Sequence, residues 1–276
     1  MISGSSKTHV FTLCCTALVA VLLLAGCGSS RSSMDVSQVE KAEQAAVPII
    51  TVDQYIDMTD LQEEGGLASG SGSGAFVQRL LQDDSFNLSP MVDLLQEKTF
   101  GMYADRLPAT ILPEEEVIGT ERYKNFNLLD KESSDDRMQR VNRLLVPEGY
   151  KKYNLGQGAL LGDRQQEMFG AVPDAADALL FVSANYAMIE DNPFWYNFLP
   201  ISPDRAYIEA TVRMEMVDRS GNTIMTIQQV ARSNNHVNTV GGVTMAPDKI
   251  SGLCVEATEQ AIAAIDKATK QELAGS

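Results

Sequence analysis

Residues that bind transition metals are scarce in this chain. It has 2 histidines and 4 cysteines among 276 residues, whereas zinc sites need several such ligands close together. His236 follows Ser233, Asn234 and Asn235, and no nearby carboxylate pattern would orient a catalytic imidazole. The sequence also lacks a Gly-x-Ser-x-Gly elbow and a His-Glu-x-x-His helix. We therefore predict no metal and no cofactor, and no motif points to an enzyme.

Positive charge is the second shortage. The chain has 22 lysines and arginines against 37 aspartates and glutamates, which gives a net charge of −15. Binding to nucleic-acid phosphates needs clustered basic residues. We therefore expect no nucleic-acid partner, and the acidity indicates mainly solubility and self-repulsion.

The amino terminus has the parts of a bacterial export signal. Lys7 precedes an apolar run over 10–25, and small residues follow it. The run closes on Leu24, Ala25, Gly26 and Cys27. These four residues resemble the lipobox, the motif cut by lipoprotein signal peptidase. The resemblance implies a signal peptide over 1–26 and a lipid on Cys27. The alternative is an uncleaved anchor helix, but a spanning helix needs about 20 predominantly apolar residues.

The residues after Cys27 bear on localisation. Gly28 and Ser29 follow it, and no aspartate stands there. The resemblance to sorted lipoproteins therefore implies an outer-membrane anchor with the domain facing the periplasm, and exposure at the cell surface is the alternative. The lipid bilayer is then a partner through the acyl chains, because each buried methylene contributes about 0.8 kcal/mol.

Cysteine supply then excludes an intramolecular disulfide. Cys14 and Cys15 leave with the signal and lipid consumes Cys27, so Cys254 alone remains. Cys254 falls on an apolar helical stripe, and we predict that it packs in the core.

Composition divides the remainder into two parts. Residues 27–46 are rich in Ser, Gln, Lys and Glu, which predicts a lipidated amino terminus followed by a flexible tether. Such a tether would span about 25 Å. Residues 47–276 are predicted to form a single periplasmic domain.

Apolar patterning predicts the strands of that domain. A first strand covers 47–52, with Pro48 at its beginning. The run 179–186 is apolar enough for a strand buried on both faces. Residues 207–217 alternate between apolar and polar, which predicts one wet face, and 223–230 return as the hairpin partner.

Helices are expected between and after these strands. Ser89 and Pro90 predict a helix start, with Ser89 as the cap. Glu114–Glu116 follow a proline and match a helix dipole better than a metal site. A long helix is predicted over 248–273. The fold class is α/β, bordering on α+β. We expect a single mixed β-sheet flanked by helices in the order β-α-β-α-β-β-β-α, with the last helix packed on the sheet.

One proline-bounded segment, 192–201, is unusually aromatic. It contains Phe194, Trp195, Tyr196 and Phe198. Such side chains can anchor a protein partner or lie at a membrane–water boundary. The alternative is a loop that packs on its own sheet. We name the four aromatics as a candidate partner contact.

The order of elements resembles the periplasmic lipoproteins of the curli-secretion-channel (CsgG-like) and TolB-amino-terminal-domain type. The resemblance lies in Val47–Ile50, Ala176–Val182, Val217–Gly221 and the alanine-rich last helix. The chain departs from that pattern over 124–170 and in the aromatic insertion. Members include secretion channels, export collars and activators of peptidoglycan synthases. None of their functional residues maps onto a motif here.

Two hypotheses for function follow. The first is a non-enzymatic outer-membrane lipoprotein that serves envelope or secretion machinery as an accessory or assembly factor through protein–protein contacts, self-association included. The alternative is a periplasmic enzyme or small-ligand binder with a carboxylate-lined pocket. A concave pocket with convergent polar groups would favour the alternative. An unpaired strand edge or an exposed apolar patch would favour the first.

Overall fold

The computed structural model centres on one mixed β-sheet. It describes residues 30–58, 80–127, 141–153, 163–191, 195–196, 199–200, 204–239 and 246–275. Across the 8-stranded sheet the order is β1 (Arg31–Met34), β9 (Thr223–Arg232), β8 (Asp204–Asp218), β5 (Ala178–Asp191), β2 (Gln44–Asp57) and β3 (Thr110–Ile111). In addition β10 (Val237–Thr239) pairs with β8, and β4 (Leu144–Leu145) pairs with β2. The β2–β5 and β2–β3 pairs are parallel and the others antiparallel. The α/β prediction is confirmed.

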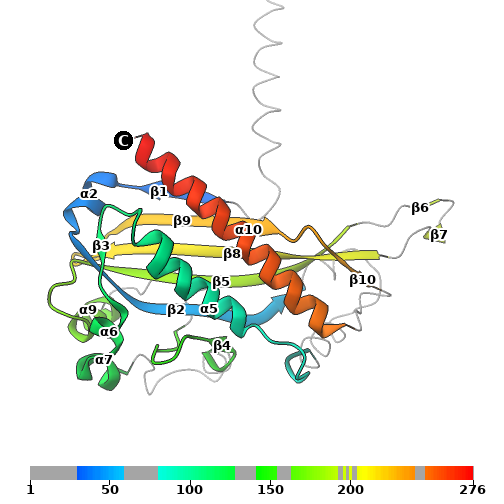
Figure 1. The fold of residues 1–276 in the computed structure, drawn as a ribbon, viewed down its shortest axis with the longest axis horizontal. Coiled ribbons are helices and arrows are strands. Elements are labelled where there is room, and N and C mark those ends of the chain that lie inside the picture. Colours follow the sequence, from blue (N-terminus) through cyan, green and yellow to red (C-terminus); the bar gives the residue numbers. More distant parts are fainter. Residues whose placement is uncertain are drawn as a thin grey trace, which may run out of the picture.

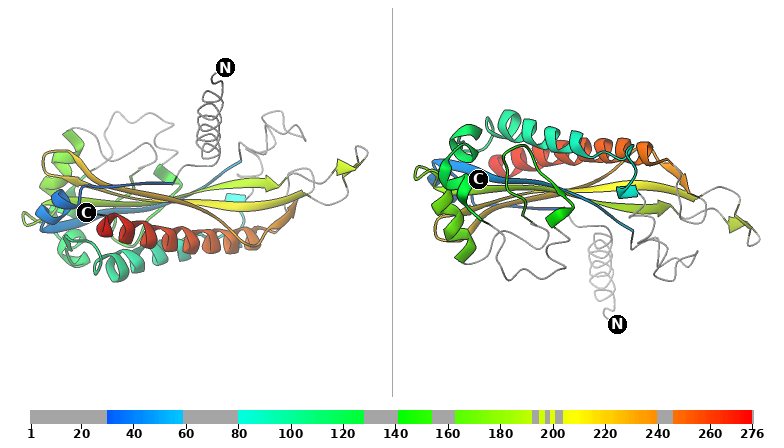
Figure 2. Two further views of the ribbon diagram at one scale, coloured as in Figure 1. Left: turned by 90° about the horizontal axis from the view of Figure 1, so that it is seen from above. Right: turned by 90° about the horizontal axis from the view of Figure 1, so that it is seen from below.

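One face of the sheet is covered by two helices, α10 (Pro247–Ala274) and α5 (Ser89–Lys98), as Figures 1 and 2 show. The alternation predicted for β8 directs its apolar side chains to this face. Those side chains are Ile208, Ala210, Val212, Met214 and Met216, and all are buried. The prediction of period two is therefore confirmed on the apolar side.

The predicted stripe of α10 is buried as expected. Cys254 and Ala257 are 0% exposed. Beside them the Tyr186 and Thr258 hydroxyls lie 2.9 Å apart, which links α10 to β5 inside the core. The Thr258 hydroxyl also donates to the Cys254 carbonyl at 2.7 Å. A buried hydroxyl is costly unless it is bonded, and these contacts satisfy both.

The opposite face is packed at one end by short helices. These are α6 (Glu114–Ile118), α7 (Glu121–Asn125) and α9 (Asp163–Ala171), which gather at one end of the sheet (Figure 1). Ile49, Leu179 and Phe181 of the sheet share an apolar cluster with Tyr123 and Phe169 of these helices. The expectation of a wet face on β8 is wrong at Glu215. That residue is 5% exposed and pairs with Arg213, two residues earlier on the same face.

The predicted flexible tether is wrong for residues 31–46. Strand β1 pairs with β9, and α2 (Val36–Lys41) buries Val39 completely. Strand β2 already begins at Gln44. Short polar segments of this kind resemble a tether in composition because an edge strand and a surface helix bury few side chains.

Pro48 lies inside β2 and not at its beginning. The pairing of β2 with β5 is irregular between Ala46 and Ile49, so the missing N–H of Pro48 falls where the ladder is interrupted. The Pro48 carbonyl accepts a hydrogen bond from the Tyr123 hydroxyl at 2.6 Å. The strand is therefore longer than predicted and contains a bulge.

The first predicted helix starts as expected, but its cap differs. The N-cap residue of α5 is Leu88, and the Asn87 side chain accepts from the Ser89 N–H at 2.9 Å. The helix continues as a π-helical turn, η1 (Thr99–Tyr103). There the Thr99 hydroxyl donates to the Leu95 carbonyl at 2.7 Å.

Candidate functional site

Strand β1 ends the sheet, and no strand among the described residues pairs with its outer side. In its register with β9, Arg31 faces Gln228 and Ser33 faces Thr226. The Asp35 N–H donates to the Ile224 carbonyl at 3.0 Å. Directly opposed residues of an antiparallel ladder alternate between bonded and non-bonded pairs.

That alternation settles which way the backbone of β1 points. Because Asp35 is in a bonded pair, Ser33 and Arg31 are bonded to β9 as well. The N–H and C=O groups of Ser32 and Met34 then point away from β9. The outer edge thus offers two donors and two acceptors.

A hollow of about 660 Å³ lies along this edge. It separates the β1–α2 segment from the last turn of α10. Its lining residues are Ser32, Ser33, Met34, Asp35, Val36, Ser37, Gln271, Glu272 and Gly275. We call it the β1 groove. It combines outward strand backbone, which no described strand pairs, with small hydroxyl side chains, and this combination suits an extended peptide.

Asp35 ends the strand and starts the helix. Its Oδ1 accepts from the Gln38 N–H at 3.1 Å and from the Ser37 hydroxyl at 2.8 Å. Aspartate is a preferred N-cap residue because its carboxylate satisfies such orphan N–H groups. The Ser37 hydroxyl and the Gln38 N–H hold the pKa of Asp35 below its ordinary value. Both bonds end on Oδ1.

A second polar cluster joins β2 to the residue before β4. The Arg143 guanidinium lies 2.9 Å from an Asp53 carboxylate oxygen and stacks 4.5 Å from the centre of the Tyr55 ring. Burial raises the pKa of Asp53, while the Tyr55 N–H and Arg143 oppose that rise. Asp53 is therefore a paired carboxylate that joins strands, and it does not form a carboxylate-lined pocket.

His236 is exposed, and the structure gives it an aromatic neighbour. Its ring centre lies 5.4 Å from that of Tyr207, and the Arg232 guanidinium lies 3.5 Å over the Tyr207 ring. The interpretation of His236 as a surface residue is confirmed. Tyr207 belongs to β8 and Arg232 to β9. His236 directly precedes β10, which pairs with β8 from Val237 onward.

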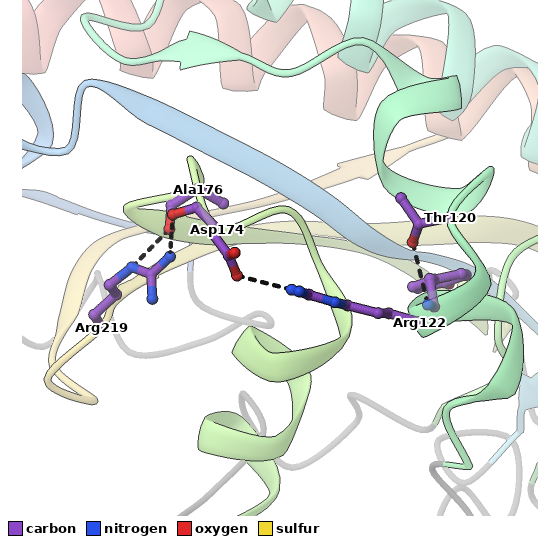
Figure 3. A network of polar contacts seen from close by, with 6 residues as sticks. Thr120, Arg122, Asp174, Ala176 and Arg219 are labelled. Carbon is purple, nitrogen blue, oxygen red and sulfur yellow. Dashed lines mark hydrogen bonds and ion pairs between the residues drawn. The ribbon is translucent and has the colours of Figure 1, made fainter.

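Two arginines form a polar network beside the β8–β9 turn (Figure 3). Arg219 donates to the carbonyls of Asp174 at 2.7 Å and Ala176 at 2.8 Å, and Arg122 pairs with the Asp174 carboxylate at 2.8 Å. The bonds join the β8–β9 turn to α7 and to the loop before β5. These cations are engaged in tying segments together, so we do not assign a ligand to them.

Most of the predicted site residues lie outside the part of the chain that the structure describes. Cys27, Leu24, Ala25 and Gly26 lie outside the described residues, as do Phe194 and Phe198. Trp195 and Tyr196 form β6 (Trp195–Tyr196), which pairs with β7 (Leu199–Pro200) in a separate two-stranded sheet. This hairpin lies beyond the ends of β5 and β8 (Figures 1 and 2).

Sequence reasoning missed the β1 groove. Its residues 32–37 fell within the expected tether, where polar composition concealed a strand and a helix. A signal was present, since Asp35 directly precedes a short helical segment and Asp is a common N-cap.

The described residues also bear on metal binding and on membrane crossing. No group of three or more His, Cys, Asp or Glu side chains lies close enough there to hold a metal ion. In the same part of the chain, no helix is both long and apolar enough to cross a membrane.

Comparison with known proteins adds little. Neither a protein-family model nor a curated protein matches the chain. A crystal structure described as a homolog of neuraminyllactose-binding hemagglutinin from Helicobacter pylori aligns with 86% of this chain and 88% of that one. Its sequence identity is 10% and its TM-score 0.33. A likeness at this score carries no conclusion about fold, ligand or partner.

Proposed function

We propose that this chain is an outer-membrane lipoprotein that acts as a non-enzymatic accessory or assembly factor in the envelope, by adding a strand of another protein chain to β1. The observation that carries the proposal is the outward direction of the Ser32 and Met34 backbone groups along the β1 groove. Strand addition gives affinity through main-chain hydrogen bonds, and a bordering groove gives specificity through side chains.

The position of β1 supports the anchoring part of the proposal. The Ser30 hydroxyl already accepts from the Val230 N–H at 3.3 Å, and Ser30 follows the expected lipidation site by three residues. Three residues span at most about 10 Å. A lipid on Cys27 would therefore hold β1 close to the bilayer surface. A partner for this edge would be met at the membrane.

The rival hypothesis needs a free carboxylate facing a concave pocket. Asp53 is occupied by Arg143, and Asp35 caps α2. The β1 groove contains Glu272 as well, and three serines, Ser32, Ser33 and Ser37, lie beside it in the lining. The groove thus favours a protein strand over a reaction centre.

The test places a photo-reactive amino acid at Glu272, which lines the groove, in the full chain in intact envelopes. We expect an adduct there and none from Lys124, which is exposed on α7, on the sheet face opposite α10. Ser32→Pro should abolish the adduct, because it removes an outward N–H while leaving the bonds to β9 in place. An adduct that survives Ser32→Pro, or no adduct at all, contradicts strand addition.

A further inference from the structure

We infer that the occupant of the β1 groove is the β1 strand of a second copy of this chain. This inference rests on the proposed function and names its partner. The outward groups of β1 belong to Ser32 and Met34. In an antiparallel pair of two β1 strands centred on Ser33, Ser32 of each copy faces Met34 of the other. All four outward donors and acceptors on each side of the pair are then used.

Charge selects this register from its neighbours. If the partner strand shifts by one residue, the outward N–H and C=O groups of one copy face residues of the other copy that are already hydrogen-bonded to β9. Registers centred on Ser32 or Met34 also bring outward groups together. Only the register centred on Ser33 places Arg31 opposite the partner's Asp35, and it does so twice by symmetry. Opposite charges facing each other across strands are stabilising.

Asp35 has an oxygen available for that contact. Its two described hydrogen bonds both end on Oδ1, so Oδ2 can accept from an arginine while the helix cap stays intact. Asp35 and Arg31 are both exposed, and both lie on the sheet face opposite α10 together with Ser33. The ion pairs would therefore form without burial of an unpaired charge.

Symmetry agrees with a shared membrane anchor. Two edge strands paired in this way are related by a twofold axis perpendicular to the sheet. Such an axis maps each face of the sheet onto itself, so both amino termini leave from the same face. Lipid chains on both copies could then enter the same bilayer. The result would be one continuous sheet with a β1–β1 junction at its centre.

The experiment replaces Ser33 with cysteine in the full chain and examines envelopes on a non-reducing gel. In the proposed register Ser33 faces its own symmetry mate in a non-bonded pair, where Cα atoms lie about 4.5 Å apart. That distance falls within the range that a disulfide spans. Ser32→Cys is the matched control, since Ser32 faces Met34 and has no copy of itself opposite. Cys254 is buried and cannot contribute.

We expect Ser33→Cys to give mainly a reducible dimer and Ser32→Cys at least tenfold less. Adding Arg31→Glu to Ser33→Cys should lower the dimer yield several-fold, whereas Arg31→Lys should leave it nearly unchanged. Equal dimer from both cysteines, or no dimer from Ser33→Cys, overturns the inference. If the Glu272 adduct then contains a different protein, strand addition stands and only the second copy is excluded. If no adduct forms either, both proposals fail.

Discussion

Tyr123 is a residue whose role depends wholly on contacts distant in the chain. Its buried hydroxyl donates to the Pro48 carbonyl at 2.6 Å and accepts from the Lys151 N–H at 2.9 Å. Burial raises the pKa of Tyr123 above its ordinary value, so the hydroxyl keeps its proton. The side chain thereby satisfies the carbonyl exposed at the irregular pairing of β2. The sequence alone could not reveal this, because the partners are 75 and 28 residues away.

Cys254 supports a prediction at the same scale. It is buried among the apolar residues of α10, and burial raises the pKa of its thiol. The reactive species is the thiolate, which is scarce in this site at neutral pH. We expect a thiol reagent to leave Cys254 unmodified in the native protein and to modify it fully in denaturant.

A mass spectrum of the reagent adduct before and after unfolding makes the measurement. A cysteine placed at the exposed position Lys124 serves as the reactive control. Rapid native modification of Cys254 would mean that the helix face is assigned wrongly.

Among the secondary-structure elements, those with strong periodicity were predictable. The alternation of 207–217 and the apolar stripe of 248–273 both produced the expected buried faces, because each pattern matches the geometry of its element. Elements with little apolar surface were not. β1 and α2 together bury one residue completely, Val39, and composition alone assigned them to a tether.

The β6–β7 hairpin supports an element-scale prediction. Among the described strands its backbone pairs within itself, and it lies beyond the main sheet (Figure 1). If Trp195 belongs to a contact surface, Trp195→Ala should lower the unfolding free energy by less than about 1 kcal/mol. Truncating a large aromatic residue in a packed core costs about 3–5 kcal/mol.

Thermal melting and denaturant titration of the variant give that number. Leu180→Ala, at a buried position of β5, is the matched core control. A loss for Trp195→Ala as large as for the core variant would place the aromatic segment in the structural interior.

At the scale of the whole molecule, the length of chain between the proposed anchor and the domain sets how far the domain can lie from the bilayer. The chain enters the sheet at Ser30, so a lipid on Cys27 would leave about 10 Å of chain between them and not the 25 Å expected for a tether. Under the proposed lipidation, such a short connection would limit which surfaces of the domain meet partners far from the bilayer. It would also make anchoring and the proposed contact at β1 interdependent.

Anchoring supports the last prediction. Cys27→Ala removes the residue that a lipid would modify, so the chain should remain unprocessed and free of acyl mass. Intact mass and membrane fractionation measure both properties. The folded domain should keep its melting temperature, because no described contact involves Cys27. A wild-type chain without acyl mass would contradict the lipoprotein proposal.

The sequence by itself determined the α/β class, the presence of the central strands though not their length, the hairpin after β8 and the buried face of α10. Each depends on a local repeat that can be read within one segment. It also determined the lipobox resemblance, which is a matter of four adjacent residues.

Only the tertiary structure decided the rest. Whether a polar segment is a tether or an edge strand depends on a neighbour nearly 200 residues later, as in the pairing of Ser33 with Thr226. The burial of Glu215 and the bulge at Pro48 likewise follow from packing between distant elements. The candidate site belongs to this second group, because a free strand edge exists only once the order of strands is set.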